Sequence, residues 1–457
     1  MQIVRGGGLG GPAPAAPDRD TARRPRLMVW SAADLRDERN VRRSLRRWLR
    51  ARGESGFARA AQVWGQAEPG PVRGAVVAAD CAEALALLDG PVPSASSSAP
   101  SSAPSSGAAQ VRQVGAAPLP VVLLLPGQGA QRPRMARGCY GWDPVFTRAA
   151  DEVFDLAGRG VREDWLAEPA ARTRRDAFGP GRAARIHHSL LQLFAVDHAL
   201  ARMLVGWGVR PAALLGQGIG ELVAAVLAGV MALEDAVRLL ALLAEETAAL
   251  APGGMLAVAA GVEEVRGQLA DGVAVAALNG PAQTVLAAGP GRALADTADR
   301  LTGAGYECLP VRTEAAFHTP HLAQACAGVA ARLPATVLRP PRLPLYSPSV
   351  GARLSADAAQ DLRHWTDLAA APVRLRDALD ALFADGDWAC VESGPGQGLG
   401  TLVRRHPAAA RAAAQTFGAL RARPGSGADD QRAVLSAAAG LWLSGHHIDF
   451  EAIRGAG

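Results

Sequence analysis

The segment LLGQGIGELVAA, residues 214–225, places an apolar strand, a sharp glycine turn and a helix in direct succession. This order is typical of a nucleophile elbow, in which a strained turn between strand and helix presents a catalytic side chain. Gly218 stands at the tip of the turn and has no side chain that could attack a substrate. The segment therefore predicts the architecture of a catalytic turn without its nucleophile.

Two more glycine-rich turns follow apolar strands in the same way, PGQGAQ at 126–131 and GPGQGLG at 394–400. From residue 121 onward, strand and helix patterns alternate, which predicts a parallel sheet of the α/β class. Residues 255–311 interrupt this alternation with the order strand, helix, strand, strand, helix, strand. That order is the ferredoxin-like motif, so we expect a small inserted subdomain there.

The rest of the chain divides by composition. Residues 1–25 are rich in Gly, Pro, Ala and Arg, and PVPSASSSAPSSAPSSGAA is typical of a flexible linker. We expect a disordered tail over 1–25, a small α/β unit over 26–90, a flexible linker over 91–120, a large subdomain over 121–254 and 312–420, the ferredoxin-like subdomain over 255–311 and a tail over 421–457.

Charge and cysteine usage limit the class of protein. A net charge of +5 is too small to indicate a nucleic-acid partner, although it suits an acidic protein. Six arginines between Arg39 and Arg50 form either a solvated helix face or a docking site for such a protein. The five cysteines never form a CxxC pair, which favours a reduced, cytoplasmic chain. No uninterrupted apolar run is long enough to predict a membrane span, and no histidine pair has metal-site spacing.

The glycine turns could also be phosphate loops or ordinary tight turns. A dinucleotide fingerprint requires G-x-G-x-x-G, whereas GQGIGE ends in Glu221, an anion where a phosphate would bind. Ordinary turns would account for any one of the three segments. They do not account for the order and spacing of all three.

The series PGQGAQ, GQGIGE, LEDAVRLLAL, LNGP, AAFHTPH, HWTDLAAAPVRL and VESGPG resembles the malonyl-CoA:acyl-carrier-protein acyltransferases. The chain is most similar to the acyltransferase domains of modular polyketide synthases, over residues 26–450. This resemblance implies an α/β-hydrolase-like large subdomain with a ferredoxin-like insertion. Residues 26–90 resemble the linker domain between ketosynthase and acyltransferase, and AAAGLWLSGHHIDFEAI resembles the linker that follows the acyltransferase.

The resemblance also implies an active site. In the family a Ser attacks the acyl-CoA thioester, a His is the general base, and the thiol of a carrier protein takes the acyl group. His318 matches the catalytic His, and Gln128 matches a residue of the oxyanion hole. The backbone N–H of Ile219 would be the second oxyanion donor. Asn279, in LNGP, is expected to bind substrate.

Several positions of the same pocket depart from the family. Gly218 replaces the Ser, Gln217 the preceding His, and Leu243 the Arg that holds the malonyl carboxylate. Leu190 stands in the place of a Gln, Ala315 in the place of a bulkier residue, and Phe317 keeps the malonyl-type pattern. All six are predicted substrate-binding positions. So many changes in one pocket favour a natural redesign over an engineered Gly218.

These changes define the functional hypotheses. A lost charge-assisted hydrogen bond of about 1.5–3 kcal/mol predicts rejection of malonyl groups in favour of neutral acyl chains. Loss of the nucleophile lowers the rate by about 10⁶, so a Ser acyl-enzyme is not expected.

One hypothesis is direct acyl transfer, with His318 deprotonating an acceptor that attacks a carrier-bound thioester. The alternative is an inactive pseudo-acyltransferase that recruits the carrier protein to a tailoring enzyme such as an oxygenase, with His318 structural. A third possibility, loading of an extender unit through an acyl-enzyme, would require a residue other than Gly218 to carry the acyl group. An open apolar pocket around Leu190, Leu243 and Phe317 would indicate that the protein binds an acyl cargo. The chain holds no cofactor itself, because the carrier protein brings the phosphopantetheine arm.

Overall fold

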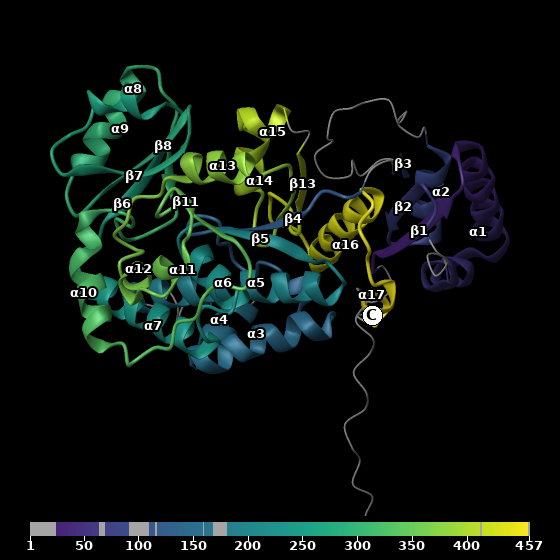
Figure 1. Cartoon of the computed structure of the whole chain (residues 1–457), viewed down its shortest axis with the longest axis horizontal. Helices are drawn as coiled ribbons and strands as arrows, with labels where there is room; N and C mark the ends of the chain where they lie inside the picture. The colour runs from purple at the N-terminus through teal and green to yellow at the C-terminus, as the bar shows by residue number, and fades with distance from the viewer. Residues whose placement is uncertain are drawn as a thin grey trace, which may run out of the picture.

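The computed structural model describes residues 24–63, 69–90, 109–114, 117–158, 160–167, 181–411 and 414–455. Their strands form three separate sheets of three, six and four strands (Figure 1). The predicted tail over 1–25 and most of the predicted linker lie outside these residues.

The N-terminal unit is an antiparallel sheet backed by two helices. Its strands β1 (Arg26–Ala32), β2 (Val72–Ala78) and β3 (Gln110–Gln113) are ordered β1-β2-β3. Helices α1 (Leu35–Val63) and α2 (Cys81–Asp89) cover a core that includes Met28, Trp30, Leu45 and Leu49. The unit was expected to end at residue 90, but β3 comes from the segment that was expected to be a linker. Only its register against β2 identifies it as a strand of this sheet.

The large subdomain is built on a mainly parallel sheet of order β11-β10-β5-β4-β12-β13. Strand β4 is the apolar run VVLLL, and all five of its residues are buried, as expected for a central parallel strand. Strand β11 is the antiparallel edge. The predicted α/β class is confirmed. The strand bounds are β4 (Val121–Leu125), β5 (Pro211–Gly216), β10 (Leu345–Ser347), β11 (Ala352–Arg353), β12 (Ala389–Glu392) and β13 (Gln415–Gly418).

Helices cover both faces of this sheet. Figure 1 shows α3, α4, α6 and α7 on one side and α13, α14 and α15 on the other. The bounds of the helices are α3 (Pro144–Ala157), α4 (Val161–Leu166), α5 (Arg182–Gly206), α6 (Ile219–Leu227), α7 (Leu233–Ala249), α10 (Ala323–Arg332), α11 (Ala356–Ala359), α12 (Leu362–Thr366), α13 (Leu375–Ala384), α14 (Gly398–Arg405) and α15 (Pro407–Arg411). Among the described helices, α5 alone is long and apolar enough to cross a membrane. Its most apolar window is 72% buried within the protein, as in a core helix.

The small subdomain has the predicted ferredoxin-like order. It comprises β6 (Gly254–Val258), α8 (Val262–Arg266), β7 (Val273–Gly280), β8 (Gln283–Ala288), α9 (Ala293–Gly303) and β9 (Cys308–Val311). The antiparallel sheet has the order β7-β8-β6-β9. Leu256 and Leu286 lie in a small separate core with Val265 of α8 and Leu301 of α9. The opposite face, which carries Met255, turns toward the large subdomain.

The C-terminal helix α16 (Gly427–Leu443) connects the units by packing on β1, β2 and β13. Arg73 of β2 is buried and donates from Nη1 to the carbonyl oxygens of Trp442, at 3.0 Å, and His446, at 2.9 Å. Its guanidinium also lies 4.3 Å from the centre of the Trp442 ring. These contacts fix the N-terminal sheet to the rest of the protein.

Replacing Arg73 with Met should loosen this attachment. The substitution leaves two carbonyl oxygens without their hydrogen-bond donor. We therefore expect the free energy of unfolding for the first urea transition to fall by about 2–4 kcal/mol. Arg112, opposite Arg73 in the β2–β3 register, is exposed and donates one hydrogen bond, from Nη1 to the Ser444 hydroxyl at 3.3 Å, so it is the control for a weaker attachment. Arg112→Met should lower stability by only about 0.5–1 kcal/mol. Equal effects of the two substitutions would contradict this account.

Candidate active site

The turn between β5 and α6 has the backbone of a nucleophile elbow. Gly218 has φ 55° and ψ −116°, and α6 begins at the next residue. A Cβ atom at Gly220 would lie 2.0 Å from the carbonyl oxygen of Leu125, so the turn presses against the end of β4. A Cβ at Gly218 would meet only His318, at 3.1 Å from Nε2. The tip of the elbow therefore lacks a side chain at the point that the imidazole faces.

His318 is held by backbone carbonyls. It has a left-handed φ of 62°, its N–H donates to the oxygen of Ala369 at 2.6 Å, and its Nδ1 lies 3.0 Å from the oxygen of Ala371. A carbonyl can only accept, so Nδ1 carries the proton and Nε2 is the free lone pair in the neutral ring. Burial lowers the pKa of His318, which keeps the ring neutral at neutral pH. The geometry supplies a base directed at Gly218.

The two predicted oxyanion-hole residues, Ile219 and Gln128, lie on neighbouring turns. Ile219 is the first residue of α6, and an amide in the first turn of a helix has no intrahelical acceptor. Gln128 follows β4 in the neighbouring glycine turn and lines the same cleft as His318. The elbow and this turn are adjacent, since the Gln217 N–H donates to the oxygen of Leu125 at 2.9 Å.

Glu221 lies buried beneath the elbow. Its carboxylate accepts hydrogen bonds from the Ser347 hydroxyl, from the Ser349 hydroxyl at 3.0 Å and from the Ser349 N–H at 3.2 Å. Burial raises the pKa of Glu221 to about 7, although these hydrogen bonds oppose the shift. Both serines thus support the turn and neither lines the cleft, which argues against their acting as substitute nucleophiles.

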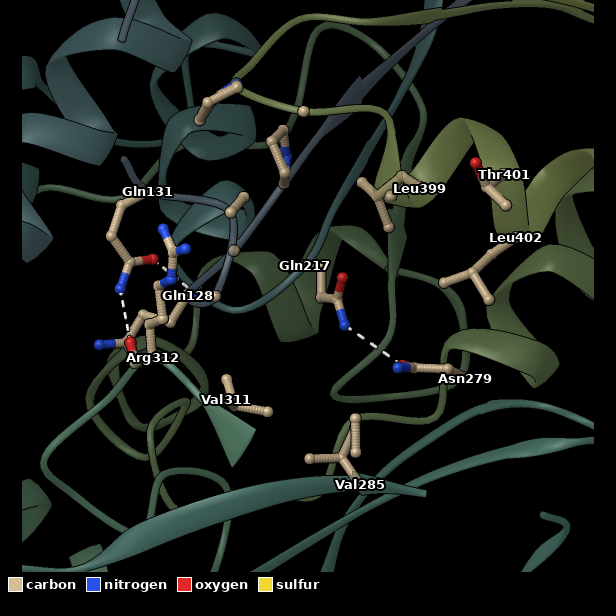
Figure 2. Close-up of a pocket in the computed structure, with 18 of the residues that line it drawn as sticks. Gln128, Gln131, Gln217, Asn279, Val285, Val311, Arg312, Leu399, Thr401 and Leu402 are labelled. Atoms are coloured by element: carbon tan, nitrogen blue, oxygen red, sulfur yellow. Dashed lines mark hydrogen bonds between the residues drawn. The ribbon is translucent and has the colours of Figure 1, made fainter. Parts of the chain in front are cut away.

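A cleft of about 820 Å³ lies between the large and the ferredoxin-like subdomains. It is lined by four of the predicted residues, Gln128, Gln217, Asn279 and His318. Figure 2 shows Gln217 reaching toward Asn279, and the Gln217 Nε2 donates to Asn279 Oδ1 at 3.3 Å. The structure therefore brings residues from four distant segments together at one site.

Gly218 and Ile219 of the elbow are not among the described residues that line the cleft, and four other predicted substrate-binding residues are buried in the core. Leu190, Leu243, Ala315 and Phe317 are 0%, 7%, 2% and 3% exposed and belong to the main hydrophobic core. None is among the described residues that line the cleft. The apolar surface next to the site is therefore formed by other residues than those predicted from the sequence.

Other lining residues were not anticipated from the sequence. Exposed arginines at 312, 405 and 423 border the cleft, and apolar side chains of the ferredoxin-like sheet and of α14 form its walls (Figure 2). They come from segments far apart in the chain, and only Arg405 lies near a recognised glycine turn. A pattern within one segment could not have identified them.

Comparison with known proteins agrees with this fold. The family model for the acyl transferase domain matches residues 122–419. A phenolphthiocerol/phthiocerol polyketide synthase of Mycobacterium tuberculosis is 36% identical over 334 residues, 72% of this chain and 22% of that protein. Polyketide synthase GfsB of Streptomyces halstedii is 31% identical over 335 residues, 72% of this chain and 6% of that protein. The chain thus spans about a fifth or less of the length of these relatives.

Solved structures show the same architecture over nearly the whole chain. The acyl transferase domain of SpnD, solved in complex with 2-(pent-4-yn-1-yl)malonyl, has a TM-score of 0.75 and 28% identity. The match covers 94% of this chain and 98% of that one. The acyltransferase domain from module 8 of the salinomycin polyketide synthase gives a TM-score of 0.75 at 27% identity, with the same coverage.

Restoring a hydroxyl at the elbow should restore covalent chemistry. In Gly218→Ser the new side chain would stand within reach of His318 Nε2, so we expect an acyl adduct from a neutral acyl thioester in intact-mass spectrometry. The natural chain should form no adduct. Both Gly218→Ser and the control Gly218→Ala place a side chain at positive φ and should lose about 1–3 kcal/mol of stability. An adduct on the natural chain would show that another residue acts as nucleophile.

The buried Glu221 predicts a pH-dependent contribution to stability. Its folded pKa of about 7 lies above the ordinary value of 4.5, so the folded state holds this proton more tightly. The resulting stabilisation is complete below pH 4.5 and is lost as the pH rises through 7. The stability difference between the natural chain and Glu221→Gln should therefore shrink by about 1–3 kcal/mol from pH 5 to pH 8.

Urea unfolding at both pH values measures this difference. Glu234→Gln removes one negative charge at an exposed position of α7 and is the control. If the Glu221→Gln difference is the same at both pH values, the titration assigned to Glu221 is wrong.

Proposed function

The chain belongs to the acyl transferase domain family, and we propose that it transfers a neutral acyl group from a carrier-protein thioester directly to an acceptor. The observation that carries this proposal is the position of His318. Its unprotonated Nε2 faces the tip of the elbow, 3.1 Å from where a Cβ of residue 218 would lie. The imidazole therefore faces the place where the family has its nucleophile.

The reaction needs no covalent intermediate on the protein. An acceptor hydroxyl or amine gives its proton to His318 Nε2 as its oxygen or nitrogen attacks the thioester carbonyl. The Ile219 N–H and Gln128 stabilise the developing oxyanion. The carbon–sulfur bond then breaks, and the imidazolium returns the proton to the leaving thiolate. The products are the acylated acceptor and the free thiol of the carrier.

The cleft suits a phosphopantetheine arm. Guanidinium groups at 312, 405 and 423 border it and can bind a phosphate by charge-assisted hydrogen bonds. The side-chain amides of Gln217 and Asn279 offer donors and acceptors for the amides of the arm. An acidic acyl carrier protein of polyketide biosynthesis is therefore the proposed partner.

The cargo should be uncharged. Leu243, in the place of the carboxylate-binding Arg of the family, is 7% exposed and surrounded by the main apolar core. A malonyl carboxylate brought to this position would be buried without a counter-charge, which is strongly unfavourable. Neutral acyl chains avoid this cost.

A second candidate is a carrier-binding pseudo-acyltransferase that presents the cargo to a tailoring enzyme such as an oxygenase. The glycine at the tip of the elbow and the core positions of Leu190 and Phe317 favour it. In this case the cleft and its arginine border would still bind the phosphopantetheine arm. His318 would only support the loop that carries it.

Replacing His318 separates the two candidates. With an acyl-loaded carrier protein and hydroxyl or amine acceptors, His318→Ala should lower turnover about 10²–10⁴-fold, measured by mass spectrometry of the products. Because burial lowers the pKa of His318, the midpoint of the acid fall in turnover of the natural chain should lie below the ordinary histidine value of 6.5.

The dissociation constant of the acyl-loaded carrier should be unchanged in this variant. His321, three residues later in the same motif, is the matched control, and His321→Ala should leave turnover unchanged. Turnover that survives His318→Ala would sink the direct-transfer mechanism. Carrier binding without turnover in the natural chain would support the pseudo-acyltransferase.

A further inference from the structure

We propose that the acyl chain of the cargo binds on the cleft-facing side of the ferredoxin-like sheet rather than in the core behind the elbow. This subsite rests on the proposed function, since it concerns the acyl thioester that the cleft would receive. It takes neutral, apolar acyl chains of several carbons. Its walls are Met255, Ala257, Val285, Leu309 and Val311 on the sheet and Leu399 and Leu402 on α14.

The first observation is an exposed leucine inside the cleft. In the described residues, the most exposed large apolar side chains are Leu35, Leu156, Leu309 and Val337. Leu309 is 58% exposed and, of these four, it alone lines the cleft. It belongs to β9, the edge strand of the sheet. Covering such a side chain with apolar surface is favourable, because it removes apolar area from water.

The strand register makes Leu309 part of a continuous surface. Ala257 pairs with Leu309 on one side and with Val285 on the other, and Val285 pairs with Ala277. Residues paired directly across antiparallel strands share a face of the sheet. Leu309 and Val285 therefore flank the small side chain of Ala257, which leaves a shallow apolar trough that runs across three strands.

A parallel row continues this trough. Met255 pairs with Val311 of β9, and both line the cleft beside the first row. On the opposite wall, Leu399 and Leu402 come from α14. Figure 2 shows them across from Val285 and Val311, with Gln217 and Asn279 between the two walls. An apolar chain in this space would contact both sides.

Space and location both favour this surface over the core. The cleft volume of about 820 Å³ is near the upper end of the ~300–1,000 Å³ typical of small-molecule sites. The core positions behind the elbow, Leu190, Leu243 and Phe317, are not among the described residues that line the cleft, whereas Met255, Val285 and Leu399 line it although they too are mostly buried. A thioester at His318 can therefore direct its acyl chain along the sheet, within the same cleft.

The test compares chain length in the natural chain and in variants. Non-hydrolysable amide analogues of acetyl- and octanoyl-pantetheine serve as probes, with dissociation constants from ligand-observed NMR. The natural chain should bind the octanoyl probe more tightly. Leu309→Ser should weaken octanoyl binding about tenfold and leave acetyl binding unchanged, as expected for losing the contact of one leucine. Val337→Ser, at a 64% exposed position outside the cleft, should change neither.

A photo-crosslink locates the chain directly. An octanoyl probe with a terminal diazirine should label peptides of β8, β9 or α14. Labelling of α5, α7 or residues 315–317 would overturn the subsite, as would equal affinity of the natural chain for both probes. Because these probes need no carrier protein and no turnover, loss of carrier binding or of His318-dependent transfer would refute the proposed function without producing either result.

Discussion

The close contact between the elbow and the end of β4 is the constraint on which the site depends. Gly220 lies against the oxygen of Leu125, and a Cβ at Gly127 would lie 2.3 Å from the oxygen of Gln217. Two glycine-rich turns at the ends of neighbouring parallel strands thus interlock, with no room for side chains between them. This contact sets the distance between Gln128 and the first amide of α6. It also fixes Gln217 at the mouth of the cleft.

The orientation of the His318 imidazole is independent of the residue at position 218. His318 is held at a left-handed φ by its own N–H bond to Ala369 and by the bond from Nδ1 to Ala371, both to backbone oxygens. Such strain persists only where the surrounding structure determines it. Because both bonds go to backbone oxygens, the imidazole keeps its place with a glycine at position 218. Glu221 and its two serines support the turn from the other side.

Features of the fold and site that depend on neighbouring residues could be predicted from the sequence. Features that depend on the pairing of distant segments could not. The glycine turns and the ferredoxin-like order follow from local spacing, and these predictions of fold are confirmed. Strand β3 was missed because it is recognised only by its pairing with β2 across a long intervening segment. Within the candidate site, Gln128, Gln217, Asn279 and His318 could be found because each lies in a recognisable motif. The apolar wall around Leu309 depends on the register of three strands, which no single segment specifies.

The amide contacts that cross the cleft have a further consequence. Gln217 Nε2 donates to Asn279 Oδ1 of the ferredoxin-like subdomain, and Gln131 Nε2 donates at 2.8 Å to the oxygen of Arg312, the residue that follows β9. The backbone joins the two subdomains as well, since the Leu278 N–H of β7 donates to the oxygen of Val373 at 2.7 Å. Widening the cleft would break such bonds, at about 0.5–1.5 kcal/mol each, so molecules with a widened cleft are a minor population. If an arm must enter through that population, its apparent affinity is reduced by the fraction of molecules that are open.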